Sequence, residues 1–148
     1  MMIRLFLAAA LAAVPLFSQD SDKADAVAVV QKLFDGMAAH DAAAIRAAVL
    51  PDARFYFLRA DGTPGNTSAD DFVTHITAAK GTLLERFTNQ PNVLIQGRIA
   101  QVWGEYEFLL NGKFHHCGID SAGLLKTAGG WKIASIVYTS ETTGCSGH

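Results

Sequence analysis

The spacing of apolar residues changes along the chain, from helical in the first half to alternating in the second. Between residues 26 and 41 apolar side chains recur every three or four positions, which predicts a helix with one buried face, started by Ser21 or Asp22. The stripe consists of Val27, Val30, Leu33, Phe34 and Met37. Asp41 and Ser68 are suited to cap two further helices. Three helices are therefore expected before residue 81, with an aromatic strand at 54–58 between the last two.

After Gly81 the pattern is typical of strands. Segments 83–88, 93–95, 99–110, 114–127 and 131–139 predict strands, and Asn111-Gly112 favours a tight hairpin between two of the longest. Long consecutive strands that follow helices indicate an α+β domain. We expect three N-terminal helices packed on a strongly curved, mainly antiparallel sheet.

The N-terminus has the composition of an export signal. Arg4 precedes the uncharged run LFLAAALAAVPLF, residues 5–17, which is shorter than the about 20 residues that span a bilayer. This pattern predicts a signal peptide at residues 1–18, and a single periplasmic or secreted domain at 19–148 with a short C-terminal tail. The alternative is an amphiphilic helix that the mature protein keeps.

The charge balance argues against polyanionic partners. The 148 residues carry a formal net charge of −2, and no segment concentrates Lys and Arg. We therefore expect no nucleic-acid partner and, after signal cleavage, no membrane partner. Cys117 and Cys145 are the only cysteines, and outside the cytosol they could form one disulfide. The alternative is two unpaired thiols.

The segment FHHCGID, residues 114–120, contains most of the candidate chemistry. In a regular strand His116 and Asp120 share a face, while His115 points to the other. A carboxylate near an imidazole can orient it for acid–base catalysis, so both are candidate catalytic residues. The alternative is structural: Asp120 accepts hydrogen bonds from the backbone or from Arg98, and His116 fills a polar edge.

Metal chemistry is not expected from this sequence. The five histidines are scattered, no C-x-x-C or H-x-x-x-H spacing occurs, and adjacent His115 and His116 should diverge. We therefore expect no metal and no other cofactor.

The longest strands predict two different surfaces. Tyr106 and Phe108 share one face with small residues, which suits the lining of a taper. Trp103 lies on the opposite face with polar neighbours, where it could belong to a dimer interface.

The order of elements, with the final stretch GKFHHCGIDSAGLLKTAGGWKIASIVYT, resembles the nuclear-transport-factor-2-like superfamily, including its SnoaL-like and lumazine-binding-like members. The resemblance covers residues 24–141, and its most specific parts are GGWKI, the H-x-G-x-D stretch and VVQKLFDGMAAHDAAAI. It implies a cone-shaped, cystatin-like α+β fold with an apolar cavity, and a homodimer formed through the outer sheet face.

The resemblance leaves function open. Ketosteroid isomerase chemistry is not expected, because the RFYFL strand has no acid and the first helix no tyrosine. SnoaL-type cyclases use an aspartate on a late strand, and Asp120 is the comparable residue. The first hypothesis is binding of a small, largely apolar molecule; the second is a cyclase, isomerase or dehydratase that uses Asp120 and His116; the third is a module that binds proteins through Trp103. The expected ligand contacts are Phe55, Phe57, Tyr106, Phe108, His116, Asp120 and Tyr138.

Overall fold

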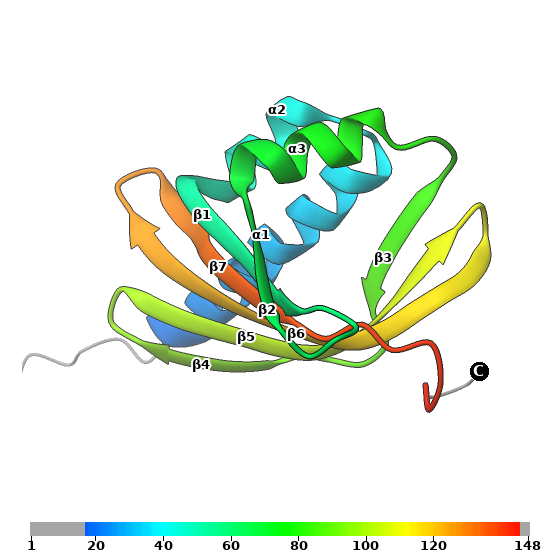
Figure 1. Cartoon of the computed structure of the whole chain (residues 1–148). Helices are drawn as coiled ribbons and strands as arrows, with labels where there is room; N and C mark the ends of the chain where they lie inside the picture. The colour runs from blue at the N-terminus through cyan, green and yellow to red at the C-terminus, as the bar shows by residue number, and fades with distance from the viewer. Residues whose placement is uncertain (1–16, 146–148) are drawn as a thin grey trace, which may run out of the picture.

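The computed structural model describes residues 17–145 and contains three helices and seven strands (Figure 1). The helices are α1 (Phe17–Ala38), α2 (Ala42–Ala48) and α3 (Ala69–Ala78). The strands are β1 (Val49–Leu58), β2 (Pro64–Ser68), β3 (Leu83–Phe87), β4 (Asn92–Gln96), β5 (Ile99–Leu110), β6 (Lys113–Thr127) and β7 (Gly130–Tyr138). The expected signal peptide, residues 1–18, lies outside the described residues except for Phe17 and Ser18, which begin α1.

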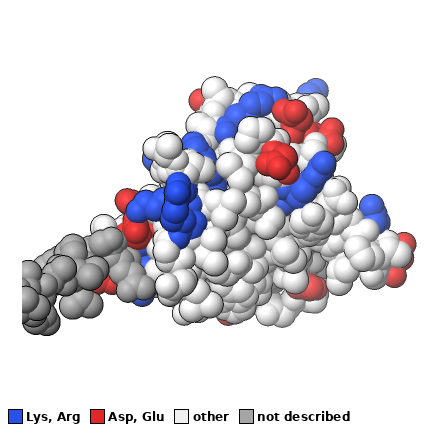
Figure 2. Space-filling view, turned by 90° about the vertical axis from the view of Figure 1, so that its left-hand side faces the viewer, with Lys and Arg blue, Asp and Glu red and all other residues white. Residues whose placement is uncertain are grey.

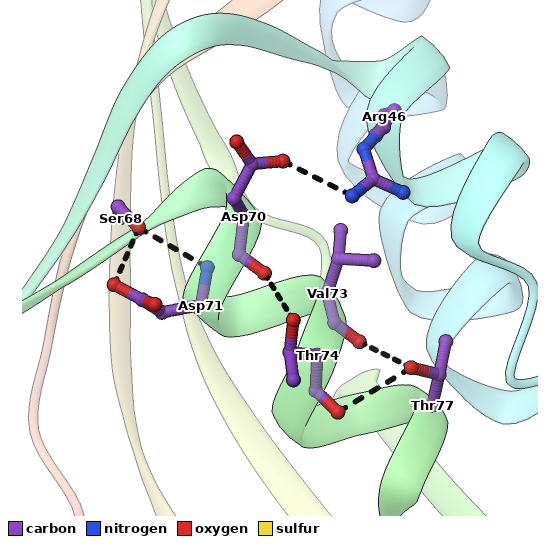
Figure 3. Close-up of polar contacts among 7 residues, drawn as sticks. All are labelled: Arg46, Ser68, Asp70, Asp71, Val73, Thr74 and Thr77. Carbon is purple, nitrogen blue, oxygen red and sulfur yellow. Dashed lines mark hydrogen bonds and ion pairs between the residues drawn. The ribbon is translucent and has the colours of Figure 1, made fainter.

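The helix starts follow local capping chemistry in two of three cases. Asp41 accepts the backbone N–H groups of Ala43 and Ala44 at the start of α2. Ser68 accepts the N–H of Asp71 at 3.1 Å, while its hydroxyl donates to the Asp71 carboxylate at 2.6 Å (Figure 3). Each cap thus satisfies N–H groups that the first helical turn leaves without partners, as predicted.

The predicted start of the first helix at Ser21 or Asp22 is wrong, because α1 begins at Phe17. No proline or glycine interrupts the segment from Ser18 to Asp25, so the helix continues through it. Asp22 is therefore inside the helix, and its carboxylate forms an ion pair with Lys126 on β6.

The sheet confirms the α+β prediction of a curved, mainly antiparallel sheet with helices on one face (Figure 1). The strand order is β2-β1-β7-β6-β5-β3, and β4 also pairs with β5. Only the β1–β7 pair is parallel among the strands of residues 17–145. The long strands β5, β6 and β7 pass under the helices, so each alternates between a helix-covered inner face and an exposed outer face.

One end of the inner face is filled by apolar side chains, and we call it the closed end. It consists of Ala100, Val102, Ala122, Leu124 and Ile133, all of them buried. They belong to the same apolar cluster as Val30, Leu33 and Phe34 of α1. Burial of these side chains supplies the main driving force for folding at this end.

The tail after β7 is tied to β6 by both covalent and hydrogen bonds. The structure joins Cys117 and Cys145 in a disulfide with a Cα–Cα distance of 6.0 Å. Glu141 and Cys117 also exchange two backbone hydrogen bonds, of 2.8 and 2.9 Å. Close approach of the tail requires glycine at 118, because a Cβ there would lie 2.1 Å from the carbonyl oxygen of Thr139.

The described helices include no membrane span, and the face drawn in Figure 2 does not concentrate charges of one sign. Among residues 17–145, no helix has the length and apolar character needed to cross a bilayer. Figure 2 shows positive and negative side chains near one another on the upper part of one face, and a broad uncharged area below them.

Candidate functional site

A cavity of about 170 Å³ opens on the inner face of the sheet, at the end opposite the closed end. We call this region the open end. Its lining comes from α1, α3 and five strands: Leu33, Met37, Phe55, Phe72, Ile76, Glu85, Tyr106, Phe108, His116, Asp120, Ile136 and Tyr138. Most of these side chains are apolar or aromatic, and two are carboxylic acids. This composition is typical of a small-molecule pocket.

Asp120 is the most deeply buried acid of the cavity. It lies on β6 opposite Gly104 of β5 and next to Tyr138 of β7, and only 3% of its surface is exposed. No backbone N–H or basic side chain of the described residues donates to its Oδ2 atom. A buried carboxylate oxygen without a donor carries a desolvation cost of about 1–3 kcal/mol, and a proton held at this carboxyl group relieves part of that cost.

Glu85 is the partner of Asp120, and the sequence analysis did not identify it. Its carboxyl group forms a hydrogen bond with that of Asp120, although the residues are far apart in sequence. A signal was present, because Leu83 and Phe87 flank Glu85 at positions i−2 and i+2 of the same strand. Their burial turns the glutamate toward the cavity as well.

The two carboxyl groups hold a proton near neutral pH. Burial, the charge of Asp120 and the hydrogen bond to it raise the pKa of Glu85 well above its usual range. Burial also raises the pKa of Asp120 to about 7, partly offset by the hydrogen bond from Glu85. Because two carboxylates in contact repel each other, Glu85 keeps its proton and donates it to Asp120. The pair can therefore accept or release one proton near neutral pH.

His116 also lines the cavity, but His115 is not on the opposite face as the sequence predicted. Phe108 pairs with His116 and Leu109 pairs with Phe114, so His115 is an extra residue in a β-bulge. The Nδ1 atoms of the two histidines lie 2.8 Å apart, which lets one ring donate to the other. Burial, with a smaller contribution from His115, lowers the pKa of His116, so its ring is neutral at pH 7.

The sequence analysis paired His116 with Asp120, but the carboxyl group of Asp120 has another partner. Both side chains line the cavity, yet the carboxyl partner of Asp120 is Glu85. Arg98, the alternative partner considered for Asp120, donates instead to the carbonyl oxygen of Lys126.

The hydroxyl groups of Tyr106 and Tyr138 add two further polar groups to the cavity lining. Tyr106 donates to the carbonyl oxygen of Thr139 at 2.7 Å, so its proton is already used within the protein. Burial raises the pKa of Tyr106 and of Tyr138, with additional effects from Glu85 and Asp120. Both hydroxyl groups therefore stay protonated at physiological pH.

Aromatic rings form the walls of the cavity. Phe55 stacks on Phe72 at a centroid distance of 4.1 Å, and Phe108 stacks on His116 at 4.9 Å. Phe57, also predicted as a ligand contact, is not part of the lining; its ring lies 5.6 Å from that of Tyr138. Phe72 also lines the cavity, although it was not among the expected ligand contacts.

The described part of the chain offers no clear metal site. Residues 17–145 contain no group of three or more His, Cys, Asp or Glu side chains placed to hold a metal ion. The argument that adjacent histidines must diverge does not apply, however, because the bulge brings them together.

Comparisons with known proteins agree on the fold. The model of a family described as "Putative lumazine-binding" matches residues 21–139. No curated protein matches the sequence significantly. A protein of unknown function from Mycobacterium tuberculosis superposes with a TM-score of 0.73 at 16% identity, over 86% of this chain and 76% of that one.

Two further solved structures show the same architecture. A nuclear transport factor 2-like superfamily protein of Salmonella enterica superposes with a TM-score of 0.71 at 14% identity, over 88% of this chain and 98% of the other. A "putative dehydratase" of Streptomyces avermitilis gives 0.67 at 15% identity, over 82% and 97%. At these identities the likeness shows the fold alone.

Proposed function

The chain belongs to this lumazine-binding family of the nuclear-transport-factor-2-like superfamily, and from that premise we propose that it is an exported protein that binds a small, largely apolar molecule in its cavity. The observation that carries the proposal is the pair of acids, Asp120 and Glu85, in a cavity otherwise lined mainly by apolar and aromatic side chains. Apolar walls supply the binding energy, and the carboxyl pair orients the ligand.

The volume limits the size of the ligand. An apolar cavity of about 150 Å³ accommodates benzene, so a cavity of about 170 Å³ fits a single ring with one or two substituents. Larger ligands would require the surrounding helices to move.

A blocked cavity tests the proposal directly. The mature protein, residues 19–148, is screened by ligand-observed NMR against single-ring probes such as toluene, phenol and benzylamine. Ile76→Phe on α3 fills the pocket and should abolish binding of every probe that the unsubstituted protein takes up. Ile95→Phe adds the same volume at a partly buried position outside the cavity and should leave binding intact. Equal binding by both variants would place the probes elsewhere, and the proposal would fail.

Export is supported by two features. The N-terminus has a signal-like composition, and the Cys117–Cys145 disulfide suits an oxidising compartment. Expression of the full chain in a bacterial host, followed by mass spectrometry of the periplasmic fraction, should detect a protein that begins at Gln19. An uncleaved N-terminus in the cytosolic fraction would contradict export.

A second candidate function is enzymatic: a SnoaL-like cyclase, isomerase or dehydratase in which Asp120 acts as the acid–base group beside His116. The observation that favours it is the shared proton, because a pKa of about 7 suits proton transfer at neutral pH. Ring ketones with an acidic C–H bond should then exchange this hydrogen for deuterium in the presence of the protein. Asp120→Asn should abolish the exchange while circular dichroism shows an intact fold.

We also propose a homodimer through the outer sheet face. Trp103, Leu94, Ile99 and Leu125 are between 42% and 72% exposed, and such a collection of large apolar side chains is typical of an interface. The β4–β5 turn lies at the end of the molecule that Figure 2 presents, where uncharged surface predominates. Trp103→Ala should shift the monomer–dimer equilibrium toward monomer in sedimentation velocity. An unchanged equilibrium would exclude this face.

A further inference from the structure

The charges that line the cavity have one sign. Glu85 and Asp120 are the only acids of the described lining, and none of its residues is Lys or Arg. Three other lining residues can titrate: His116 and Tyr106 from β6 and β5, and Tyr138 from β7. The pKa of the histidine is lowered and those of the tyrosines are raised, so all three are neutral near pH 7. The helices contribute only Leu33, Met37, Phe72 and Ile76.

Above about pH 7 this arrangement leaves one uncompensated negative charge in the cavity. Glu85 is protonated and donates to Asp120, so the charge resides on the aspartate. No described backbone N–H or basic side chain donates to the Oδ2 atom of that aspartate. Isolated buried charges are costly unless they are paired, and no described side chain pairs this one with a positive charge.

The walls of the cavity also suit a cation. The stacked Phe55 and Phe72 and the ring of Phe108 line the same cavity as the carboxyl pair. Aromatic faces attract cations through the ring quadrupole, and more strongly where water is excluded. An anionic ligand would meet both the carboxylate and these faces unfavourably.

We propose that the cavity selects small ring compounds that carry a protonated nitrogen, whose N–H group donates to the carboxylate of Asp120. The inference rests on the proposed binding function and names its ligand class. The ammonium or ring N–H neutralises the charge, while the ring occupies the aromatic pocket.

Matched probes separate charge from shape. Benzylamine, benzyl alcohol and benzoate share the ring and differ in charge, and at about pH 8 the amine is still protonated. Isothermal titration of the mature protein, residues 19–148, should show benzylamine binding about ten- to hundredfold more tightly than benzyl alcohol, since hydrogen bonds to charged groups are the stronger ones. Benzoate should not bind measurably.

Two isosteric variants test which carboxyl group holds the cation. Asp120→Asn should reduce benzylamine affinity at least about tenfold and leave benzyl alcohol affinity nearly unchanged. Glu85→Gln should lower benzylamine affinity less than Asp120→Asn does, because the glutamine amide still donates to the Asp120 carboxylate. Glu105→Gln, on the outer face beside Tyr106, removes the same formal charge outside the cavity and should change neither affinity.

The outcomes distinguish this inference from the function on which it rests. If benzyl alcohol binds as tightly as benzylamine, the cavity does not select positively charged ligands, and the proposed binding function is unaffected. Loss of amine selectivity in Glu85→Gln but not in Asp120→Asn would also overturn the inference. If no single-ring probe binds, the proposed function fails, and the inference fails with it.

Discussion

The closed and open ends of the inner sheet face are built from the same two strands, β5 and β6, yet one is filled and the other is hollow. At the closed end Val102, Ala122 and Leu124 pack into the apolar cluster that includes α1. At the open end Tyr106, Phe108 and His116 surround a cavity. The strand pairing shifts by one residue beside Phe108, where the bulge places His115 against His116. Small apolar side chains therefore permit close packing, whereas rings, polar groups and a bulge keep space free.

The difference also concerns charge. The side chains that define the closed end include no ionisable group, while the open end buries Glu85 and Asp120 together. Buried acids that share a proton reduce stability at neutral pH, and proteins usually retain such groups where they serve binding or catalysis. The closed end thus stabilises the fold, whereas the buried acids of the open end lower stability and make the pocket polar.

The largest expected effect is loss of packing at the closed end. Leu124 is 1% exposed, and Leu124→Ala should lower the free energy of unfolding by about 2–5 kcal/mol. Phe108→Ala removes a larger but half-buried side chain beside an existing cavity, and should cost less. Urea denaturation of both variants measures the two values. Equal losses, or a larger loss at Phe108, would show that the two ends do not differ in packing.

Next in size is the disulfide, which holds the tail behind the open end. It closes a loop with a sequence separation of 28, so Cys117→Ser/Cys145→Ser should lower the free energy of unfolding by about 3 kcal/mol. Ser140→Ala, a change on the tail without loss of the crosslink, serves as the control. A loss below about 1 kcal/mol would mean that the hydrogen bonds between Glu141 and Cys117 already restrain the tail.

The carboxyl pair should make stability fall as pH rises. Burial raises the pKa of Asp120 from its ordinary value of 3.8 to about 7, so the folded state binds more protons than the unfolded state between these values. Stability from this group is complete below about pH 4 and is lost as pH rises through about 7. Glu85 acts in the same direction because its pKa is also raised.

Asp120→Asn removes one of these titrations. Relative to the unsubstituted protein, the variant should gain stability between about pH 4 and pH 8, by a few kcal/mol at most, since one pKa unit corresponds to about 1.4 kcal/mol. Thermal unfolding at several pH values measures the difference, with Asp70→Asn on the surface of α3 as the control. A difference that does not depend on pH would contradict a shared proton in the cavity.

The smallest effect is expected outside both ends, where α2 meets α3. Arg46 and Asp70 form an ion pair of 3.0 Å, but their side chains are 51% and 80% exposed (Figure 3). Such pairs contribute about 0–1 kcal/mol, so a double-mutant cycle of Arg46→Ala and Asp70→Ala should give a coupling energy in this range. A coupling energy above about 2 kcal/mol would place this contact among the main determinants of stability.

Much of the fold could be predicted from local patterns. The stripe from Val27 to Met37, the caps at Asp41 and Ser68, and the hairpin signal Asn111-Gly112 each correspond to an element of the structure. These signals depend on neighbours within a few residues, because helix and strand periodicity are properties of the backbone itself. The start of α1 was missed because polar residues can extend a helix as well as cap it.

The candidate site was predicted only in part. Alternation along β6 placed His116 and Asp120 on one face, and both line the cavity. The same rule separated His115 from His116, and it failed at the bulge, which depends on how β6 pairs with β5. Phe57 was included for its aromatic ring; it shares strand β1 with the lining residue Phe55 but lies nearer the end of that strand, where its ring is next to Tyr138.

By itself, the sequence determined the order of helices and strands, the faces of the long strands and the placement of Asp120 on the same face as His116. Only the tertiary structure decided that Glu85 meets Asp120 and that Cys117 lies beside Cys145. Periodicity reports which side of an element is buried, because that depends on backbone geometry over a few residues. It does not report which buried groups touch, because contact and desolvation arise when distant strands pair and the sheet bends around the helices.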